Sequence, residues 1–232
     1  FIMTIWAILP AAGIGRRMGS ITPKQYISVC GTPVLVHSIK RLLAVEEIEQ
    51  LVVVLQEDDT WWSELNFYDP RMSTTWGGDE RFNSVLNGLE AILERAEADD
   101  WVLVHDAVRP CVTQADIRKL ILELSEHSVG GLLATPIADT VKQAGVDEHV
   151  IRTLDRNGLW SALTPQMFRF ELLYKALSNA VTKGISVTDE ASAVENLGLK
   201  PKIVMGEKSN LKITHEADLI IAESFLSSEG IE

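Results

Sequence analysis

A glycine-rich segment close to the amino terminus carries arginines and is followed within a few residues by a lysine. An apolar run at residues 5–9 leads into PAAGIGRRMG at 10–19, and PKQ follows at 23–25. Small residues allow backbone N–H groups to approach phosphate oxygens closely. Arg17 and Lys24 supply the positive charge that a transferred phosphoryl or nucleotidyl group requires. The segment therefore predicts nucleotide chemistry.

Three phosphate-binding patterns can be compared with this segment. The P-loop pattern Gly-x-x-x-x-Gly-Lys-Ser/Thr is absent from it. The dinucleotide pattern Gly-x-Gly-x-x-Gly has Met18 at its third glycine. This pattern also requires an acidic residue at the end of the second strand, about 20 residues after the glycines. The second apolar run here ends near Leu55, which is too far along the chain. The nucleotidyltransferase pattern L-x-A-A-G-x-G-x-R-M-G matches residues 9–19 throughout.

Composition limits the classes of ligand and compartment. The 232 residues carry a formal net charge of -12, which argues against a nucleic-acid or anionic membrane surface. A phosphate ligand must therefore be held by local clusters of Arg and Lys. Cys30 and Cys111 form neither a disulfide framework nor a zinc spacing. The apolar start is too short to span a bilayer, and we expect a cytoplasmic protein.

Apolar runs alternate with amphipathic stretches along the chain. The apolar runs that we predict to be strands are 5–9, 51–55, 101–105, 131–135 and 202–205. The amphipathic stretches that we predict to be helices are 34–43, 81–95, 113–127, 171–183, 189–197 and 216–227. This alternation predicts an α/β fold with a mostly parallel, Rossmann-like sheet covered by helices on both faces. Ligands bind such sheets at the carboxyl ends of the strands, where 10–19 and HDAVRP at 105–110 both lie.

One stretch departs from this alternation. Residues 140–154 alternate in polarity around a Gly/Asp turn, which predicts a hairpin projecting as an arm at about 137–158. This hairpin could equally serve as an arm that contacts a second subunit or be a simple surface insertion. The chain has no repeats or linkers, so we expect one domain over 1–232.

Several blocks of sequence together resemble one family, the bacterial 2-C-methyl-D-erythritol 4-phosphate cytidylyltransferases of isoprenoid biosynthesis. The resemblance runs from the first strand to the last helix, through LPAAGIGRRMG, PKQY, GGDERFNSV, VHDAVRP, the DT of PIADTVK, DRNGLWSALTPQ, TDEASAVE and NLKIT. It implies a nucleotidyltransferase sheet and a reaction in which CTP and 2-C-methyl-D-erythritol 4-phosphate give 4-diphosphocytidyl-2-C-methyl-D-erythritol and pyrophosphate. It also implies Mg²⁺ or another divalent cation as cofactor.

For the nucleotide, the resemblance implies two catalytic residues and a set of contacts. Arg17 and Lys24 would stabilise the α-phosphoryl group in the transition state. Asp106 would contact both the nucleotide and the metal ion. The other residues that the resemblance places at the nucleotide are Ala11, Ala12, Gly13, Gly15, Gly78, Asp79, Ser84 and Ala107. Two simpler interpretations remain open, in which Asp79 caps a helix and Asp106 orders its turn through Arg109, while His105 packs against the sheet.

For the acceptor phosphate, the resemblance implies a second set of residues: Arg109, Thr140, Arg156, Thr188 and Lys212. Thr140 and Arg156 flank the hairpin, which in this family reaches into the partner's site, so a homodimer is implied. Thr188 has an alternative role as the cap of the following helix.

Two rival functions remain open. A cytidylyltransferase for another polyol phosphate, such as ribitol 5-phosphate, would keep Arg17 and Lys24 and could differ between Arg109 and Arg156. A catalytically inactive nucleotide-binding protein is the other, and every charged position that the chemistry requires is filled, which argues against it. Pyrophosphate release with each candidate acceptor discriminates among the three.

Overall fold

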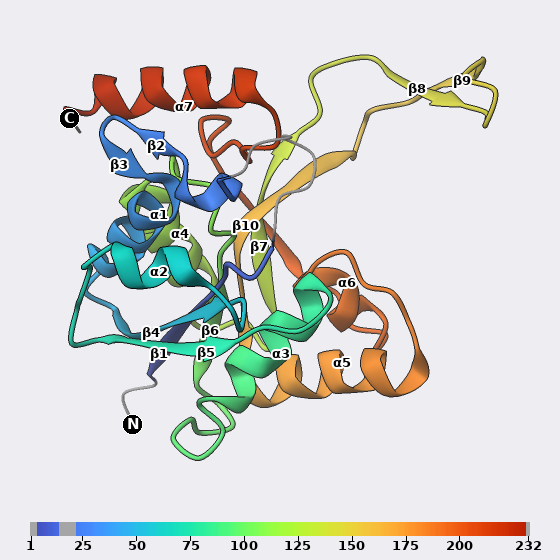
Figure 1. Cartoon of the computed structure of the whole chain (residues 1–232). Coiled ribbons are helices and arrows are strands. Elements are labelled where there is room, and N and C mark those ends of the chain that lie inside the picture. Colours follow the sequence, from blue (N-terminus) through green and yellow to red (C-terminus); the bar gives the residue numbers. More distant parts are fainter. Residues whose placement is uncertain (1–3, 14–21, 231–232) are drawn as a thin grey trace.

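The central sheet is mixed and mostly parallel. The computed structural model describes residues 4–13 and 22–230, and within these ranges the main sheet has seven strands in the order β11-β7-β10-β6-β1-β4-β5 (Figure 1). Their bounds are β1 Ile5–Pro10, β4 Ile48–Leu55, β5 Met72–Trp76, β6 Trp101–Val104, β7 Gly130–Pro136, β10 Trp160–Arg169 and β11 Lys202–Met205. β10 runs antiparallel to β6 and β7, and the other neighbours pair in parallel. The predicted fold class is confirmed.

Strand β1 is an interior strand of the sheet, between β6 and β4, and it is apolar on both of its faces. Ala7 pairs with Leu51 of β4 on one side and with Leu103 of β6 on the other. Successive side chains of a strand point to opposite faces, so Ala7 and Leu9 enter one core while Trp6 and Ile8 enter another. A strand that is buried on both faces is continuously apolar in sequence.

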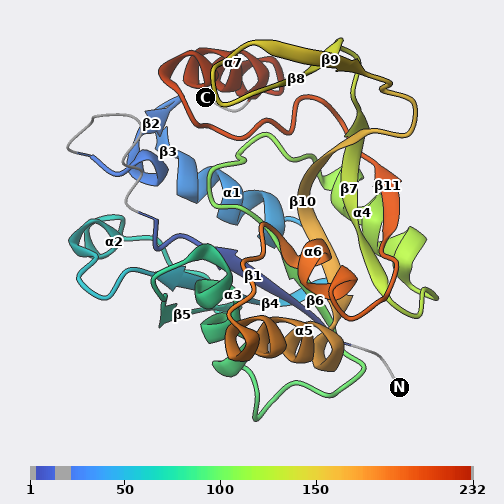
Figure 2. The ribbon, with the colours of Figure 1, turned by 90° about the vertical axis from the view of Figure 1, so that its right-hand side faces the viewer.

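Helices cover both faces of the sheet (Figure 2). On one face lie α1 (Val34–Leu43) and α4 (Gln114–Leu124), which contribute Leu35, Ile39, Leu42, Ile117, Leu120 and Leu124 to the first core. On the other lie α3 (Arg81–Glu90), α5 (Phe170–Lys183) and α6 (Glu190–Glu195), which contribute Val85, Leu89, Leu173, Leu177 and Val194 to the second. Within residues 4–13 and 22–230, no helix has the length and apolar character needed to cross a membrane.

A third, smaller core joins the carboxyl-terminal helix to the segments near the sheet edge. It contains Val29, Val34, Val108, Cys111, Ile213, Ala222 and Leu226. The remaining elements are the 3₁₀ helix η2 (Lys24–Tyr26), the strand pair β2 (Ser28–Val29) and β3 (Thr32–Pro33), the short helix α2 (Thr60–Glu64) and α7 (Glu216–Ser228). Helix α7 packs beside β2 in Figure 1. This packing holds the loop before α7 close to the residues that follow β6.

Two strands of the main sheet were not expected from the sequence. β10 contains Pro165, and a proline normally argues against a central strand because it cannot donate to the ladder. In the structure the register between β10 and β7 shifts between Ala162 and Gln166, so Pro165 lies inside this irregularity. β5 is an edge strand of mixed polarity, MSTTW, and its apolar signal is correspondingly weak. Helix α3 also ends at Glu90, before the predicted 95.

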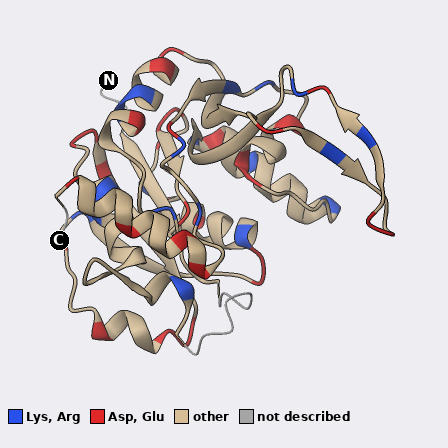
Figure 3. Ribbon diagram, turned by 90° about the horizontal axis from the view of Figure 1, so that it is seen from above, with Lys and Arg blue, Asp and Glu red and all other residues tan. Residues whose placement is uncertain are grey.

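A hairpin is inserted between β7 and β10. Strands β8 (Val141–Ala144) and β9 (Val150–Leu154) form their own antiparallel sheet, which Figure 1 shows projecting away from the main body. Figure 3 shows Lys and Arg along its strands and acidic residues at its tip. Because β7 and β10 are antiparallel neighbours, the chain leaves the sheet and returns to it at adjacent positions.

Gly88 provides a test of how closely α3 packs on the sheet. A Cβ at this position would lie 2.7 Å from Cγ2 of Ile8 and 3.1 Å from Cγ2 of Val54. Gly88→Ala gains about 1 kcal/mol of helix propensity, but overpacking costs about 1–3 kcal/mol. We expect a net fall in the free energy of unfolding, measured by urea denaturation. The exposed Ser224→Ala change in α7 is the control, since it raises helix propensity without new contacts. A gain in stability for Gly88→Ala would contradict the close approach.

Candidate active site

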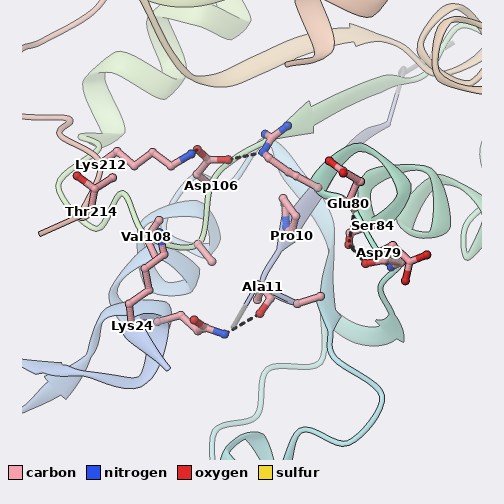
Figure 4. A pocket seen from close by; sticks show the side chains of 16 residues that line it. Pro10, Ala11, Lys24, Asp79, Glu80, Ser84, Asp106, Val108, Lys212 and Thr214 are labelled. Atoms are coloured by element: carbon pink, nitrogen blue, oxygen red, sulfur yellow. Dashed lines mark hydrogen bonds and ion pairs between the residues drawn. The ribbon is translucent and has the colours of Figure 1, made fainter. Parts of the chain in front are cut away.

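A cavity of about 490 Å³ opens at the carboxyl ends of β1, β5 and β6 (Figure 4). Its lining residues come from segments far apart in the chain: Pro10, Ala11, Ala12, Gly13, Lys24, Gln25, Gly78, Asp79, Glu80, Arg81, Ser84, Asp106, Ala107, Val108, Lys212 and Thr214. We call this space the first cavity. Most of the residues expected at the nucleotide are therefore brought together, whereas Gly15 and Arg17 lie outside the described residues.

The turn after β1 is held from both sides. The Ala11 N–H donates to the Val54 carbonyl at 2.7 Å, which continues the pairing of β1 with β4. Nε2 of the buried Gln25 donates to the Ala11 carbonyl at 2.8 Å. The backbone N–H and carbonyl of Ala11 are thus both satisfied, which fixes the orientation of the two peptide units that flank this residue. Gln25 therefore joins the PKQ segment to the glycine-rich turn at the wall of the cavity.

Lys24 and Lys212 lie on the same side of the first cavity, across from Asp79, Glu80 and Ser84 (Figure 4). The peptide of the buried Ile213 sets this arrangement, because its N–H donates to the Val108 carbonyl at 2.9 Å. Its carbonyl accepts from Nζ of Lys24 at 3.4 Å. The loop before α7 is thus docked beside the residues that follow β6.

The start of α3 approaches the turn after β1 because residue 77 is glycine. A Cβ there would lie 2.5 Å from Cβ of Ala12 and 2.7 Å from Oγ of Ser84. Oγ of Ser84 also accepts from the Gly78 N–H at 3.2 Å. The interpretation of Asp79 as the helix cap is wrong, since the capping residue is Glu80, whose N–H donates to Oδ1 of Asn83 at 3.2 Å. Glu80, one position later, has the extended backbone that a cap requires, so Asp79 lies outside the helix.

Asp106 is buried at the end of β6 and is surrounded by cations. Oδ1 accepts from Nε of Arg81 at 2.7 Å, and Oδ2 accepts from Nζ of Lys212 at 2.8 Å. Nε of Arg109 lies 3.7 Å from Oδ2. Burial alone would raise the pKa of Asp106, but the positive charges of Arg81 and Lys212 outweigh it and hold this pKa far below its usual range. The carboxylate is therefore ionised, and Arg109 is its most distant cationic partner of the three.

Arg81 extends this cluster to a second carboxylate. Nη1 and Nη2 donate to Oε1 and Oε2 of Glu190 at 2.6 and 3.2 Å, a bidentate pair. Glu190 is 0% exposed and begins α6. Sequence reasoning assigned no role to either residue. Their only signal was membership of the GGDERFNSV and TDEASAVE blocks, because an ion pair between residues 109 positions apart has no local pattern.

A second cavity of about 210 Å³ adjoins the first and shares its ion cluster. Its lining residues are Arg81, Asp106, Arg109, Ala162, Leu163, Thr164, Gln166, Thr188, Asp189 and Lys212. Residues common to both cavities are Arg81, Asp106 and Lys212. Two adjoining spaces with cations at their boundary suit two anionic ligands that react with each other.

The residues expected at the acceptor divide into two groups. Arg109, Thr188 and Lys212 line the second cavity, but Thr140 and Arg156 lie on the hairpin segment and line neither cavity. Thr188 does not cap α6. The cap is Asp189, whose Oδ1 accepts from the Ser192 N–H at 2.9 Å, and Thr188 precedes it.

His105 is fully buried and supports the turn that carries Asp106. Its Nε2 lies 3.0 Å from the Arg109 carbonyl, which can only accept, so Nε2 carries the proton. Nδ1 then accepts from the hydroxyl of Thr164 at 3.0 Å. That hydroxyl oxygen accepts from the Asp106 N–H at 3.0 Å. His105 is thus a packing residue that orders this turn.

Burial lowers the pKa of His105 to about 4, from an ordinary value of 6.5. Below pH 6.5 the unfolded chain therefore binds a proton that the folded chain does not, and stability falls as the pH drops towards 4. The loss from this group amounts to about 3 kcal/mol. We expect wild type to lose about this much more stability than His105→Gln between pH 7 and pH 4, measured by urea unfolding. Equal losses in both proteins would contradict a neutral, buried imidazole.

The fit of a divalent cation depends on Asp106. No three His, Cys, Asp or Glu side chains gather as a metal cluster in the described part of the chain. Mg²⁺ commonly takes one or two carboxylates and completes its shell with water and substrate phosphates. The single Asp106 carboxylate at the boundary of the two cavities fits this mode of binding.

Comparisons with known proteins agree in sequence and in structure. The model of the 2-C-methyl-D-erythritol 4-phosphate cytidylyltransferase family matches residues 5–228. A cytidylyltransferase of this name from Vibrio vulnificus (strain YJ016) is 48% identical over 224 residues, covering 96% of this chain and 94% of the relative. The one from Hahella chejuensis is 48% identical over 96% of this chain and 92% of its own length. The crystal structure of the Francisella tularensis protein superposes with a TM-score of 0.85 at 37% identity, covering 96% of this chain and 100% of that one.

Proposed function

This chain belongs to the 2-C-methyl-D-erythritol 4-phosphate cytidylyltransferase family, and we propose that its two adjoining cavities hold the two substrates of that reaction. The protein is a nucleotidyltransferase that joins CTP and 2-C-methyl-D-erythritol 4-phosphate. The observation that carries the assignment of substrates to cavities is the shared boundary of Arg81, Asp106 and Lys212. Membership of this family also favours the assignment of methylerythritol phosphate, and not ribitol phosphate, as the acceptor.

The reaction needs no protein nucleophile. An oxygen of the acceptor phosphate attacks the α-phosphorus of CTP in line, and the bond to the leaving pyrophosphate breaks. The acceptor phosphate is already largely ionised at neutral pH, so no general base is required for the attack. The barrier lies in bringing two anions together and in stabilising the charge on the α-phosphoryl oxygens.

The first cavity takes CTP in this proposal. The backbone of the turn after β1 faces the triphosphate through Ala11, Ala12 and Gly13, and the start of α3 holds base and ribose through Gly78, Asp79 and Ser84. Gly15 is assigned to the same ligand from the sequence and lies outside the described residues. Ala107 contributes backbone contacts from the end of β6. The support is that the described members of this set line one concave surface at the carboxyl ends of parallel strands.

Lys24 and Arg17 stabilise the transition state in this proposal. Lys24 lines the first cavity on the side of Lys212, where the two cavities meet. Arg17 belongs to the glycine-rich segment and lies outside the described residues. Charged donors aimed at developing charge in a water-poor site contribute about 2.7–4 kcal/mol each.

The second cavity takes the acceptor. Lys212 and Arg109 supply positive charge to its phosphate, and Thr188 supplies a hydroxyl near its polyol. Nζ of Lys212 donates to Oδ2 of Asp106 at 2.8 Å, so the phosphate of the acceptor competes with this carboxylate for the same ammonium group. Cations that Asp106 already orients need little reorganisation when the substrate binds.

A divalent cation completes the proposal. Mg²⁺ bound through Asp106 would neutralise charge on the triphosphate oxygens. Arg81 restrains Asp106 at the boundary of the two cavities, where such an ion would bind. The same carboxylate orients Lys212 towards the second cavity, so a single residue serves both substrates.

The active unit that we propose is a homodimer in the cytoplasm. Thr140 and Arg156 line neither cavity of their own chain, and a partner's site is where their side chains would act. The hairpin that carries them exposes the apolar side chains of Val146, Val150 and Ile151. Exposed apolar side chains of this kind favour contact with another protein surface. Both cysteines are free thiols, which agrees with a reducing compartment.

Pyrophosphate release from CTP with different acceptors tests the function. We expect release with 2-C-methyl-D-erythritol 4-phosphate and Mg²⁺, and none with ribitol 5-phosphate or without acceptor. Lys24→Ala is the control that links activity to the first cavity, with a rate about 10²–10³ lower. Release only with ribitol 5-phosphate would overturn the acceptor assignment, and no release with any acceptor would indicate an inactive nucleotide-binding protein.

Mixing two inactive variants tests the shared site. In the proposed dimer each site takes Lys24 from one chain and Arg156 from the other. A dimer of one Lys24→Ala chain and one Arg156→Ala chain therefore has one site with both residues intact and one site that lacks both. After complete subunit exchange, we expect about a quarter of wild-type activity. Lys24→Ala mixed with Lys212→Ala is the control, because both residues line the cavities of one chain and no intact site forms. Exchange proven by mass spectrometry without recovery in the first mixture would contradict the shared site.

A further inference from the structure

Glu190 is a buried carboxylate next to the active site that lines neither cavity. It is the first residue of α6, and both of its oxygens accept from the guanidinium of Arg81. The Glu190 carboxylate is removed from water, so breaking the pair is costly because it would leave this buried charge without a partner. Glu190 is therefore a strong restraint on the position of Arg81.

Arg81 transmits this restraint to the boundary between the two cavities. Its Nε donates to Asp106 at 2.7 Å, and the side chain lines both cavities. Arg81 begins α3, just after the residues that line the first cavity, while Glu190 follows Thr188 and Asp189 of the second. The ion pair thus connects the wall of one cavity to the wall of the other.

The end of α6 that carries Glu190 is itself held against the sheet. Oε1 of Gln166 in β10 accepts from the Ala191 N–H at 2.8 Å, and its Nε2 donates to Oδ2 of Asp189 at 2.8 Å. Residues on both sides of Glu190 are therefore anchored to the same buried side chain. Glu190 is a fixed point, and it is Arg81 that is positioned by the pair.

Charge balance gives the pair a second effect. Arg81, Arg109 and Lys212 bring three positive charges to the cluster, and Asp106 and Glu190 bring two negative ones, which leaves one positive charge. Without the charge of Glu190 the same cluster would have two. A triphosphate would then be attracted more strongly, while Arg81 would be held by Asp106 alone and no longer from the side of α6.

We propose that Glu190 is a positioning residue for cytidylyl transfer, one that sets the spacing of the two substrates by holding Arg81 between them. This inference rests on the proposed function. In-line attack depends on the relative placement of acceptor oxygen and α-phosphorus, and a displacement of about 1 Å can cost about 10²-fold in rate. Glu190 acts through Arg81 and touches neither substrate.

The test compares Glu190→Gln with Asp100→Asn as a matched control. Asp100 is also a buried carboxylate, which accepts from the Thr4 N–H, Nε1 of Trp6 and the Glu97 N–H. It precedes β6, at the opposite end of the strand from Asp106. Both substitutions remove one buried charge with almost no change of shape. Wild type is assayed first, so that inactivity of wild type with CTP and methylerythritol phosphate counts against the proposed function and not against Glu190.

We expect Glu190→Gln to lower kcat by about 10- to 100-fold while KM for CTP stays the same or falls. Asp100→Asn should lose thermal stability and keep the kcat of wild type. Titration calorimetry with CTP should give Glu190→Gln a Kd equal to or lower than that of wild type, whereas partial unfolding would raise this Kd. Loss of kcat together with retained or tighter binding is the pattern of lost positioning.

The inference is overturned if kcat of Glu190→Gln falls by less than about fivefold, or if its KM and Kd for CTP rise with the loss of rate. Should Glu190→Gln fail to fold, Glu190→Asp takes its place, because it keeps the charge but retracts it by one methylene. The same decision applies to that variant: kcat must fall without weaker CTP binding. Equal kinetic losses in Asp100→Asn would also overturn the inference.

Discussion

The rest of the site depends on one buried negative charge at the end of β6. Asp106 is 6% exposed, and removing a carboxylate from water costs several kcal/mol unless it is paired and hydrogen-bonded. β6 lies between β10 and β1 and is buried throughout, so the carboxylate that follows it has little access to solvent. Positively charged side chains must therefore pair with it. Arg81 of α3, Lys212 of the loop before α7 and Arg109 of the turn itself do so, and Arg81 and Lys212 form the boundary between the cavities.

This arrangement also explains how an acidic chain can bind anionic substrates. The net charge of -12 is spread over the molecule, whereas Arg81 and Lys212 lie where the two cavities meet. Lys24 adds a positive charge in the first cavity and Arg109 another in the second. Asp106 and Glu190 hold two of these cations in place before any substrate is present. Charges that are oriented in advance stabilise a transition state more than charges free to move, because little reorganisation is needed during the reaction.

The sequence predicted those features whose signal is local. Continuous apolar runs identify β1 and β6 because strands buried on both faces need apolar residues at every position. The rule for carboxyl ends then places Ala11 and Asp106 near each other. β10 was not predicted because Pro165 and its polar neighbours interrupt the apolar pattern. The ion pair of Arg81 and Glu190 was not predicted because only folding brings residues so distant in sequence together.

The insertion point of the hairpin has a consequence for its length. Since β7 and β10 are antiparallel neighbours, any segment between them spans the same short gap, and doubling the length of such a segment costs only about 0.6 kcal/mol in chain entropy. The walls of the first cavity come from the ends of β1, β5 and β6, from η2, from the start of α3 and from the loop before α7, none of which this insertion interrupts. The length of the hairpin between Thr140 and Arg156, and with it the reach of the arm, can therefore change without altering the pocket for the nucleotide.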